Sequence, residues 1–448
     1  MKCELIHSCG SDRLILIFAG WSTSADFYKD VAVDGYDVMV ASDYSDMDFP
    51  KDMLRGYSIV CLFAWSLGVF AASRSLPFER IALAVAVNGT ERPVDDSYGI
   101  PERIFKGTAD GLNERNLMKF RRRMSGQDYD RIKERFSEDS ADILSKQLLY
   151  IGEQSGESDK RGRWDCAYIS TEDAIFPHDN QLSFWQTYHP DTERRENVAP
   201  HFVDMAALVS GIIAERASVG EKFRKALPSY DSHADAQKKI ARHLADLIPQ
   251  GSYRKVLEIG AGSGLFSRMF AERFRPEKMD FIDLYELPRL DVAPEERYMT
   301  GDAEDLVKEL SSSEANSYDA IISASSIQWL VDHESFFRNV ARLLKDGGIF
   351  ACSTFTSGNL HELLGVNPFC LVYRSRERLR GMLEDKFSNV MHSEEEIIVE
   401  FPGTRQLMLH LQKTGVGGNS KSTLPLSETL HRLPSRLTYK PFYVIARK

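Results

Sequence analysis

A serine in the first hundred residues stands where the sequence could place a nucleophile. Ser66 lies in the segment 64–68 (A-W-S-L-G), which follows the apolar run 59–63 and precedes a stretch of small residues. A strand, a tight turn and a helix in this order are typical of a nucleophile elbow, written G-x-S-x-G, here with alanine as the first small residue. The strained turn would present the Ser66 hydroxyl for attack on an acyl group; the alternative is a structural serine.

A serine hydroxyl needs a base and an orienting acid, and the sequence offers candidates for both. With this kind of elbow the acid precedes the histidine along the chain. Asp173 follows the apolar run 166–170, and His201 comes just before a helix-like segment at 204–215. We therefore predict Asp173 as the acid and His201 as the base. The alternatives left open are His178 and His189 for the base and Asp165 and Asp179 for the acid.

The oxyanion formed by such an attack needs hydrogen-bond donors, and two backbone N–H groups are candidates. Leu67 would open the helix after the elbow, where N–H groups lack partners and can hold an anion. Trp21 follows Gly20, at the end of the first apolar run, and its N–H is the second candidate. The alternative for this second segment is a simple glycine turn.

A second chemical signal lies in the segment 255–264 (K-V-L-E-I-G-A-G-S-G). It predicts a strand that runs into a turn containing Gly260, Gly262 and Gly264 and then into a helix. Such glycines let the backbone approach a ligand at the strand ends, where open α/β sheets bind cofactors. Dinucleotides and S-adenosylmethionine (SAM) are both compatible with this turn alone.

Three acidic residues favour SAM over a dinucleotide. Glu258 lies just before the glycines, where a carboxylate suits a cationic amino-acid group better than a pyrophosphate. Asp283 ends the next predicted strand and can accept both ribose hydroxyls. Asp302 follows the third strand and can take the adenine amino group. To the same cofactor site we assign the neighbouring residues Leu284, Ala303 and Ser323.

The elements that must position these residues form two series. In the first, short apolar runs rich in Val, Ile and Leu predict buried parallel strands at 14–18, 36–40, 59–63, 81–87 and 166–170. The charged, helical stretch 101–150 interrupts them and predicts a helical lid, with a solvated helical face as the alternative. The second series predicts helices at 234–247, 264–274 and 334–344 and strands at 255–259, 280–284, 320–323 and 349–355.

Alternation of strands and helices indicates an α/β fold in both parts. A chain of 448 residues is long for one domain. The apolar signal weakens after 217, so we predict two domains, 1–217 and 218–448.

The composition excludes several classes of protein. Hydrophobic residues make up 43% and charged residues 27%, which are globular values, and the net charge of -10 argues against a general nucleic-acid binder. Six scattered cysteines without metal-ligand spacing predict mostly buried thiols in a reducing compartment and no metal site. There is no signal-peptide pattern at the N-terminus and no run long enough to cross a bilayer. We therefore expect a cytoplasmic protein without a membrane segment.

The first part, roughly residues 1–215, resembles the BioG-type pimeloyl-ACP methyl ester esterases of biotin synthesis, where ACP is acyl carrier protein. The resemblance rests on F-A-G-W at 18–21, F-A-W-S-L-G at 63–68 and P-H-F at 200–202. It implies an α/β-hydrolase fold that acts on the methyl ester of pimeloyl-ACP. Ser66, Asp173 and His201 would then be nucleophile, orienting acid and base, with Trp21 as an oxyanion donor.

The second part resembles a class I SAM methyltransferase with a Rossmann-like fold, and more narrowly the BioC-type malonyl-ACP O-methyltransferases. The narrower resemblance rests on the segments 227–234 (L-P-S-Y-D-S-H-A), 322–330 (I-S-A-S-S-I-Q-W-L) and 355–363 (F-T-S-G-N-L-H-E-L). It implies that Tyr230 folds over the cofactor, that Gln237 lines it, and that the Gln328-Trp329 element meets the substrate. The alternative is that Tyr230 and Trp329 are core aromatics.

Methylation of a carboxylate needs no general base, because the carboxylate is already ionised at pH 7. Alignment and exclusion of water should supply most of the rate. A positive group must still receive the substrate, and Arg374 and Arg376 lie in an arginine-rich run at 373–380. One arginine could bind the malonyl carboxylate and others the acidic carrier protein; a solvated charged face is the alternative.

Together these patterns predict a bifunctional enzyme that uses SAM and acts on malonyl and pimeloyl methyl ester groups carried by ACP. Two other hypotheses remain open from the sequence. The first part could be an inactive hydrolase-like module that docks ACP, and the second part could methylate another small acid or a phenol.

Overall fold

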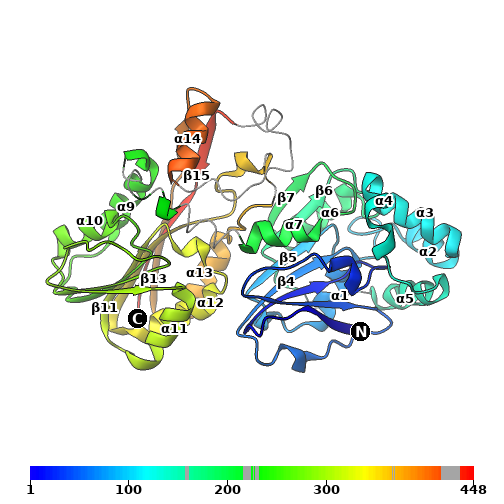
Figure 1. Ribbon diagram of the computed structural model, residues 1–448, viewed down its shortest axis with the longest axis horizontal. Coiled ribbons are helices and arrows are strands. Elements are labelled where there is room, and N and C mark those ends of the chain that lie inside the picture. The colour runs from blue at the N-terminus through cyan, green and yellow to red at the C-terminus, as the bar shows by residue number, and fades with distance from the viewer. Residues whose placement is uncertain are drawn as a thin grey trace. The chain divides into compact units, whose positions relative to one another are not determined.

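The chain divides into two compact units, Met1–Ala214 and Glu215–Lys448. A computed structural model describes residues 1–156, 161–214, 223–225, 227, 232–365, 367, 369–414 and 434–448. Each unit is built on its own sheet with helices packed against it (Figure 1). The predicted domain boundary between 217 and 218 lies outside the described residues.

The first unit contains a seven-stranded sheet in the order β1-β3-β2-β4-β5-β6-β7. All neighbouring strands are parallel except β1, which runs antiparallel to β3 at one edge. The central strand β4 is buried along its whole length, as its apolar sequence predicts. The strands are β1 (Lys2–His7), β2 (Arg13–Phe18), β3 (Asp37–Ser42), β4 (Ile59–Trp65), β5 (Leu83–Val87), β6 (Cys166–Ser170) and β7 (Glu193–Asn197).

The two edge strands, β1 and β7, were not predicted. The sequence of β7, E-R-R-E-N, contains no apolar residue. It nevertheless buries Arg195, whose guanidinium pairs with Glu193 at 2.9 Å and donates to the hydroxyl of Tyr168 at 2.9 Å. Pairing of these charges within the protein lets a strand without apolar residues be partly buried. A search for apolar runs therefore cannot find it.

Between β5 and β6 the chain forms a helical insertion at one end of the unit (Figure 1). Two of its helices begin at side-chain caps, since Asn113 and Ser140 accept hydrogen bonds from backbone N–H groups in the first turn. The unit also has α1 (Leu67–Ser75), α6 (His178–Tyr188) and α7 (Met205–Val209), and α7 continues as a π-helical turn, Ser210–Ala214. The insertion helices are α2 (Glu102–Asp110), α3 (Glu114–Ser125), α4 (Tyr129–Ile132) and α5 (Ala141–Gln154).

The second unit contains a seven-stranded sheet in the order β10-β9-β8-β11-β12-β16-β13. The first five strands are parallel, and β16 runs antiparallel to both β12 and β13. A small separate sheet pairs β14 (Ile397–Glu400) with β15 (Arg436–Tyr439). The main strands are β8 (Lys255–Ile259), β9 (Lys278–Asp283), β10 (Glu295–Thr300), β11 (Tyr318–Ala324), β12 (Leu344–Phe355), β13 (Asn389–Glu394) and β16 (Pro441–Arg447).

Two hydrophobic clusters cover the faces of this second sheet. One joins it to α9 (Asp235–Leu247), α10 (Leu265–Phe274) and α14 (Thr404–Thr414). The other joins it to α11 (Ala303–Ser313), α12 (His333–Leu343) and α13 (Arg376–Glu384). Helices on both faces of a mostly parallel sheet confirm the predicted α/β architecture.

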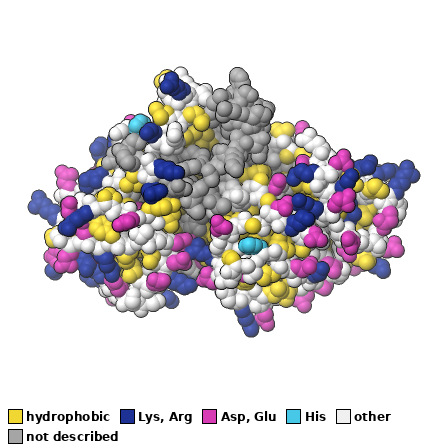
Figure 2. Space-filling model, viewed as in Figure 1, with side chains coloured by type: hydrophobic (Ala, Val, Ile, Leu, Met, Phe, Trp, Pro, Cys, Tyr) yellow, Lys and Arg dark blue, Asp and Glu magenta, His cyan; other side chains and the backbone are white. Residues whose placement is uncertain are grey.

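The surface of the described residues carries charges of both signs. Figure 2 shows basic and acidic side chains interspersed over the visible face rather than gathered into one basic field. In the part of the chain that the structure describes, no helix has the length and apolar character needed to cross a bilayer.

The packing around Gly68 in α1 gives a test of the first unit's stability. A Cβ atom at Gly68 would lie 2.5 Å from the carbonyl oxygen of Phe18, which belongs to the backbone and cannot move aside. We expect Gly68→Ala to lower the free energy of unfolding by about 2 kcal/mol, measured by urea unfolding followed through tryptophan fluorescence.

Gly107, in the exposed part of α2, is the matched control because a Cβ there would meet nothing within 4 Å. Gly107→Ala should raise stability by about 0.5 to 1 kcal/mol through helix propensity. Equal effects of the two substitutions would contradict the packing argument.

Candidate active sites

The turn between β4 and α1 holds Ser66 in a strained conformation. Its φ is 60° and its ψ is -128°, a region that residues with side chains rarely adopt. The Ser66 N–H donates to the carbonyl of Val87 at 2.8 Å. Gly89 approaches so closely that a Cβ there would lie 2.3 Å from the Ser66 carbonyl oxygen. The surrounding backbone therefore fixes the strained turn.

His201 and Asp173 complete a hydrogen-bonded chain with Ser66. The Nε2 atom of His201 lies 2.9 Å from Ser66 Oγ, and its Nδ1 atom lies 2.7 Å from Asp173 Oδ2. All three residues are buried, with His201 fully so. Because the carboxylate accepts a hydrogen bond from Nδ1–H, Nε2 is left to accept the serine proton. The structure thus brings together the three residues that the sequence analysis selects as nucleophile, base and acid.

Asp173 is itself held by donors that keep it aligned with the imidazole. Its Oδ1 accepts the N–H groups of Ile175 at 2.8 Å and Phe176 at 2.9 Å. Its Oδ2 also accepts from Nε2 of Gln181 at 3.2 Å. These hydrogen bonds offset the cost of burying a carboxylate.

Three further residues fix His201 and were not singled out from the sequence. Its carbonyl accepts from Nδ2 of Asn88 at 2.8 Å and from Nε1 of Trp65 at 3.1 Å. The ring of Phe176 stacks on the imidazole with an interplanar angle of 8°. Trp65 lies inside the elbow motif and Asn88 directly follows β5. Nothing in the sequence around either residue indicates that its side chain bonds to the His201 carbonyl.

The alternative acids and bases have other partners in the structure. His178 lies 2.9 Å from Asp179, and this contact raises the pKa of the histidine. His189 contacts the buried Glu91 at 3.1 Å. Asp165 accepts a backbone N–H at the start of β5. The geometry therefore favours His201 and Asp173 over each of them.

Both predicted oxyanion donors line one small cavity with Ser66. This cavity, of about 30 Å³, also receives side chains from α2, α3 and α5 of the insertion, among them Phe105. Leu67 is the first residue of α1, where no carbonyl within the helix can accept its N–H. Trp21 shares the same cavity wall. The insertion thus covers the serine, as a lid would.

Two contacts tie the Trp21 segment to the insertion. The indole Nε1 of Trp21 donates to the carbonyl of Leu144 in α5 at 3.2 Å. From α3, Nε of Arg121 donates to the hydroxyl of Ser22 at 2.8 Å. The loop after β2 and the helical insertion are therefore held as one assembly.

In the second unit, three glycines shape the turn after β8. Gly260, Gly262 and Gly264 have φ values of 73°, 55° and 74°, which favour glycine. A Cβ at Gly260 would lie 2.0 Å from Ser326 Oγ, whereas one at Gly262 would meet nothing within 4 Å. The turn therefore combines tight packing beneath with free space beside Gly262.

Two buried carboxylates flank this turn. Glu258 is only 1% exposed, and its Oε2 has no hydrogen-bond partner among the described residues. Burial raises the pKa of Glu258 to about 7. Asp283, at the end of β9, accepts the Gly262 N–H at 3.0 Å, and burial raises its pKa as well. A buried carboxylate oxygen without a hydrogen-bond partner fits a ligand that brings a positive charge.

The remaining predicted cofactor residues occupy varied positions. Asp302 caps α11 by accepting the Glu304 N–H at 2.9 Å, with Ala303 as the first helical residue. The hydroxyl of Ser323 donates to a carbonyl at the end of β8. Leu284 is 43% exposed just after β9. The structure gives Asp302 and Ser323 local roles, so their contacts with a cofactor stay predictions.

Two predicted cofactor residues, Tyr230 and Gln237, come before β8 in the sequence. Gln237 in α9 is buried, and its Oε1 has no partner among the described residues. Tyr230, predicted to fold over the cofactor, lies outside the described residues.

The Gln328-Trp329 element forms a short 3₁₀ helix, η7 (Ile327–Trp329), after β11. The amide of Gln328 donates to the carbonyl of Ser325 at 2.6 Å, while its Oε1 has no partner within the described ranges. Trp329 is half-buried. A residue that the sequence analysis missed, Glu304, accepts the N–H groups of Val331 and the next residue and so fixes this loop to α11.

The structure separates the two predicted substrate arginines. Arg374 is buried, and its Nη2 donates to the carbonyl of Val331 at 3.0 Å, beside the η7 loop. Arg376 lies on the surface, where it pairs with Glu377 at 2.6 Å and Glu394 at 2.7 Å. The two side chains therefore do not form one group, and Arg374 is the one near the loop.

Comparisons with known proteins agree with the resemblance predicted for each half of the chain. The family model described as Pimeloyl-ACP methyl esterase BioG matches residues 1–206, and one described as Methyltransferase domain matches residues 230–393. A malonyl-[acyl-carrier protein] O-methyltransferase from Bacteroides fragilis is 35% identical over 97% of this chain and 92% of its own. One from Porphyromonas gingivalis is 34% identical over 51% of this chain and 94% of its own.

Among solved structures, the crystal structure of BioG from Haemophilus influenzae is 34% identical, with a TM-score of 0.42, and covers 45% of this chain and 94% of that one. The family models confirm the predicted fold classes, an α/β-hydrolase fold followed by a Rossmann-like class I methyltransferase fold. They also confirm SAM as the cofactor of the second unit. Within the described residues, no cluster of His, Cys, Asp and Glu could hold a metal ion.

The raised pKa of Glu258 predicts that SAM binding depends on pH. With a pKa of about 7, most of this carboxylate is protonated at pH 6 and ionised at pH 8. Because the ionised form attracts the cationic ligand, the dissociation constant for SAM should be about tenfold lower at pH 8 than at pH 6, measured by calorimetry.

Glu258→Gln is the control, since it keeps the shape but cannot ionise. The variant should bind SAM more weakly than the wild type at pH 8 and lose most of the pH dependence of binding. This comparison also separates the titration of Glu258 from the titration of SAM itself. The same pH slope in both proteins would contradict the assignment.

Proposed function

The chain belongs to the malonyl-[acyl-carrier protein] O-methyltransferase family, and we propose that it is a bifunctional enzyme of biotin synthesis. Its second unit transfers a methyl group from SAM to the free carboxylate of malonyl-ACP. Its first unit hydrolyses the methyl ester of pimeloyl-ACP to pimeloyl-ACP and methanol. The observation that carries the proposed hydrolysis is the buried hydrogen-bonded chain from Ser66 through His201 to Asp173.

In the proposed hydrolysis, His201 Nε2 accepts the proton of Ser66 as Oγ bonds to the ester carbonyl carbon. The carbonyl oxygen becomes an oxyanion, which the N–H groups of Leu67 and Trp21 stabilise. His201 then gives its proton to the departing methoxide, so methanol leaves and an acyl-serine remains. Water, deprotonated by His201, releases the acid and restores Ser66.

In the proposed methylation, SAM supplies an electrophilic methyl group on a cationic sulfur. The carboxylates of Glu258 and Asp283 hold that positive ligand at the glycine turn. The loop with Gln328 and Trp329 would close over the substrate and exclude water. No residue needs to take a proton, because the substrate carboxylate is already ionised.

The two activities serve opposite ends of one sequence of reactions. A free carboxylate is costly to place in the apolar pockets of chain-elongating enzymes, and methylation removes its charge. Hydrolysis restores the charge once the chain is long enough. Each additional buried methylene contributes about 0.8 kcal/mol, so preference for the longer ester would prevent early hydrolysis.

Substitution of the nucleophile tests the independence of the two activities. We expect Ser66→Ala to lower the rate of ester hydrolysis at least about 10³-fold, because the acyl-serine cannot form. SAM-dependent methylation of malonyl-ACP should keep its wild-type rate. Loss of both activities together would contradict separate sites, unchanged hydrolysis would rule out Ser66 as the nucleophile, and absence of hydrolysis by the wild type would favour an inactive hydrolase-like module.

The substrate of the second unit is tested by competition among carboxylates. Methyl transfer from labelled SAM should be fastest with malonyl-ACP, slower with malonyl-coenzyme A, and slowest with free malonate. The order follows if the carrier protein contributes binding energy. A free acid or a phenol methylated faster than malonyl-ACP would overturn this assignment.

A further inference from the structure

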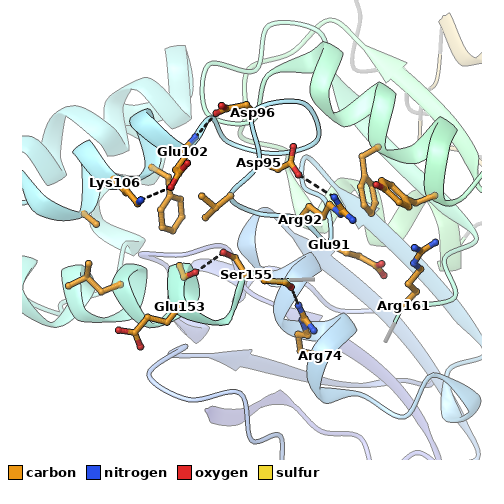
Figure 3. Close-up of a pocket in the computed structure, with 18 residues that line it drawn as sticks. Arg74, Glu91, Arg92, Asp95, Asp96, Glu102, Lys106, Glu153, Ser155 and Arg161 are labelled. Atoms are coloured by element: carbon orange, nitrogen blue, oxygen red, sulfur yellow. Dashed lines mark hydrogen bonds and ion pairs between the residues drawn. The ribbon is translucent and has the colours of Figure 1, made fainter. Parts of the chain in front are cut away.

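In the proposed hydrolysis the oxyanion forms in the small cavity at Ser66 and not in the large cleft beside it. The cleft, shown in Figure 3, has a volume of about 750 Å³ and is lined by charged side chains of both signs, but neither Ser66 nor Trp21 lines it. Phe105 lines both spaces. The cavity at Ser66 has a volume of about 30 Å³, and Trp21 and Leu67 line it. The groups that meet the developing charge are therefore those of the small cavity.

The backbone N–H of Trp21 is not used by the fold. Trp21 is only 4% exposed, and among the described residues no carbonyl or side chain accepts its backbone N–H. Its indole N–H, by contrast, donates to the carbonyl of Leu144. Buried backbone N–H groups without an acceptor are rare in proteins, and a catalytic role is one of the few reasons for them. This N–H is therefore free to serve an oxyanion at Ser66.

The direction of the Trp21 N–H is set through the carbonyl of Gly20, which belongs to the same peptide unit. A trans peptide is planar, so its N–H points opposite to its C=O. Thr23 donates twice to the Gly20 oxygen, from its hydroxyl at 2.6 Å and from its backbone N–H at 3.2 Å. Both donors come from one buried residue, so the position of Thr23 fixes the plane of the peptide between Gly20 and Trp21.

Tyr28 completes a closed ring of hydrogen bonds with Gly20 and Thr23. Its hydroxyl oxygen accepts the Gly20 N–H at 2.9 Å and lies 3.1 Å from the Thr23 hydroxyl. Because the single proton of the Thr23 hydroxyl goes to the Gly20 carbonyl, the proton in this second contact comes from Tyr28. Burial raises the pKa of the Tyr28 hydroxyl, so the phenol stays protonated, as the ring requires.

The residue after Trp21 is held in a strained conformation. Ser22 has a φ of 71°, a region that residues with side chains rarely adopt. Its carbonyl accepts the backbone N–H of Ser137 at 3.2 Å, and its hydroxyl accepts from Arg121. Such strain persists only where the surrounding structure fixes it, and it is concentrated at active sites.

We propose that Thr23 and Tyr28 are positioning residues, whose hydroxyls hold the peptide between Gly20 and Trp21 so that its N–H faces the oxyanion at Ser66. This inference rests on the proposed hydrolysis, in which that oxyanion forms. Two donors on the Gly20 oxygen also polarise the peptide, which strengthens its N–H as a donor. Neither Thr23 nor Tyr28 lines the cavity at Ser66, so both act through Trp21.

Replacement of the Thr23 hydroxyl by a methyl group tests the positioning role. In Thr23→Val, kcat for the methyl ester of pimeloyl-ACP should fall about tenfold, because one oxyanion donor is misaligned rather than removed. KM should stay unchanged, since only the transition state carries the oxyanion. Thr23→Ser keeps the hydroxyl and should restore most of kcat. An unchanged kcat, a rise in KM alone, or a Thr23→Ser enzyme as slow as Thr23→Val would overturn the proposal.

Thr192→Val is the matched control in the same unit. Thr192 is also buried, and its hydroxyl donates to the backbone carbonyl of Trp164 at 3.0 Å. This substitution should lower the midpoint of urea unfolding as Thr23→Val does, but it should leave kcat at the wild-type value. An equal fall of kcat in both variants would indicate a general effect of lost stability and would overturn the positioning role.

Tyr28→Phe removes the other hydroxyl of the ring and keeps the aromatic side chain. It should lower kcat without changing KM, as Thr23→Val does, and it takes the place of that variant if Thr23→Val does not fold. A wild-type kcat in Tyr28→Phe would exclude Tyr28 from the ring that positions the donor.

Labelling by a fluorophosphonate measures the same donor without the proposed ester. Ser66 Oγ bonds to phosphorus as fluoride leaves, His201 takes the serine proton, and the phosphoryl oxygen occupies the place of the oxyanion. Mass spectrometry should show Thr23→Val labelled about tenfold more slowly than the wild type. If the wild type is labelled but hydrolyses no methyl ester, the proposed function fails while the labelling rates still decide on Thr23. Equal labelling rates, or a wild type without label at Ser66, would exclude the positioning role.

Discussion

The close approach of α1 to the end of β2 is the constraint on which the first unit depends. A Cβ at Gly68 would meet the Phe18 carbonyl oxygen at 2.5 Å, and one at Gly20 would meet the Trp65 ring at 2.7 Å. Such contacts hold Ser66 in a conformation that costs about 1 to 3 kcal/mol elsewhere. The same Trp65 holds the His201 carbonyl through its indole N–H. One packed turn therefore positions Ser66 and His201 together.

The two candidate sites lie at the same kind of place, the carboxyl ends of parallel strands, but their electrostatics differ. In the first unit the Asp173 carboxylate is satisfied by several donors before any substrate arrives. In the second unit Glu258 is buried with one oxygen lacking a partner in the described structure. The first arrangement is preorganised for charge that develops during a reaction, and the second for charge that a ligand brings.

The sequence predicts most of what local pattern controls. Apolar runs locate the buried parallel strands, whereas the order along the chain favours Ser66, Asp173 and His201 but leaves other acids and bases open. The edge strand β7 was missed because its charges are paired inside the protein, and β13 because its residues are largely exposed. Supporting contacts such as Asn88 to His201 join residues far apart in the chain. Likewise, nothing in the alternating arginine run shows that Arg374 is buried while Arg376 is not.

The anchoring of the loop after β2 has a consequence for any shortened form of the first unit. Trp21 and Ser22 depend on Leu144 and Arg121, both in the helical insertion, for contacts that fix their backbone. Trimming the insertion to widen access to Ser66 would also remove the contacts that support Trp21, the predicted oxyanion donor. A version of the first unit reduced to its sheet would expose Ser66 but lose the contacts that hold this loop, so access to Ser66 and support of the loop cannot be separated by deletion.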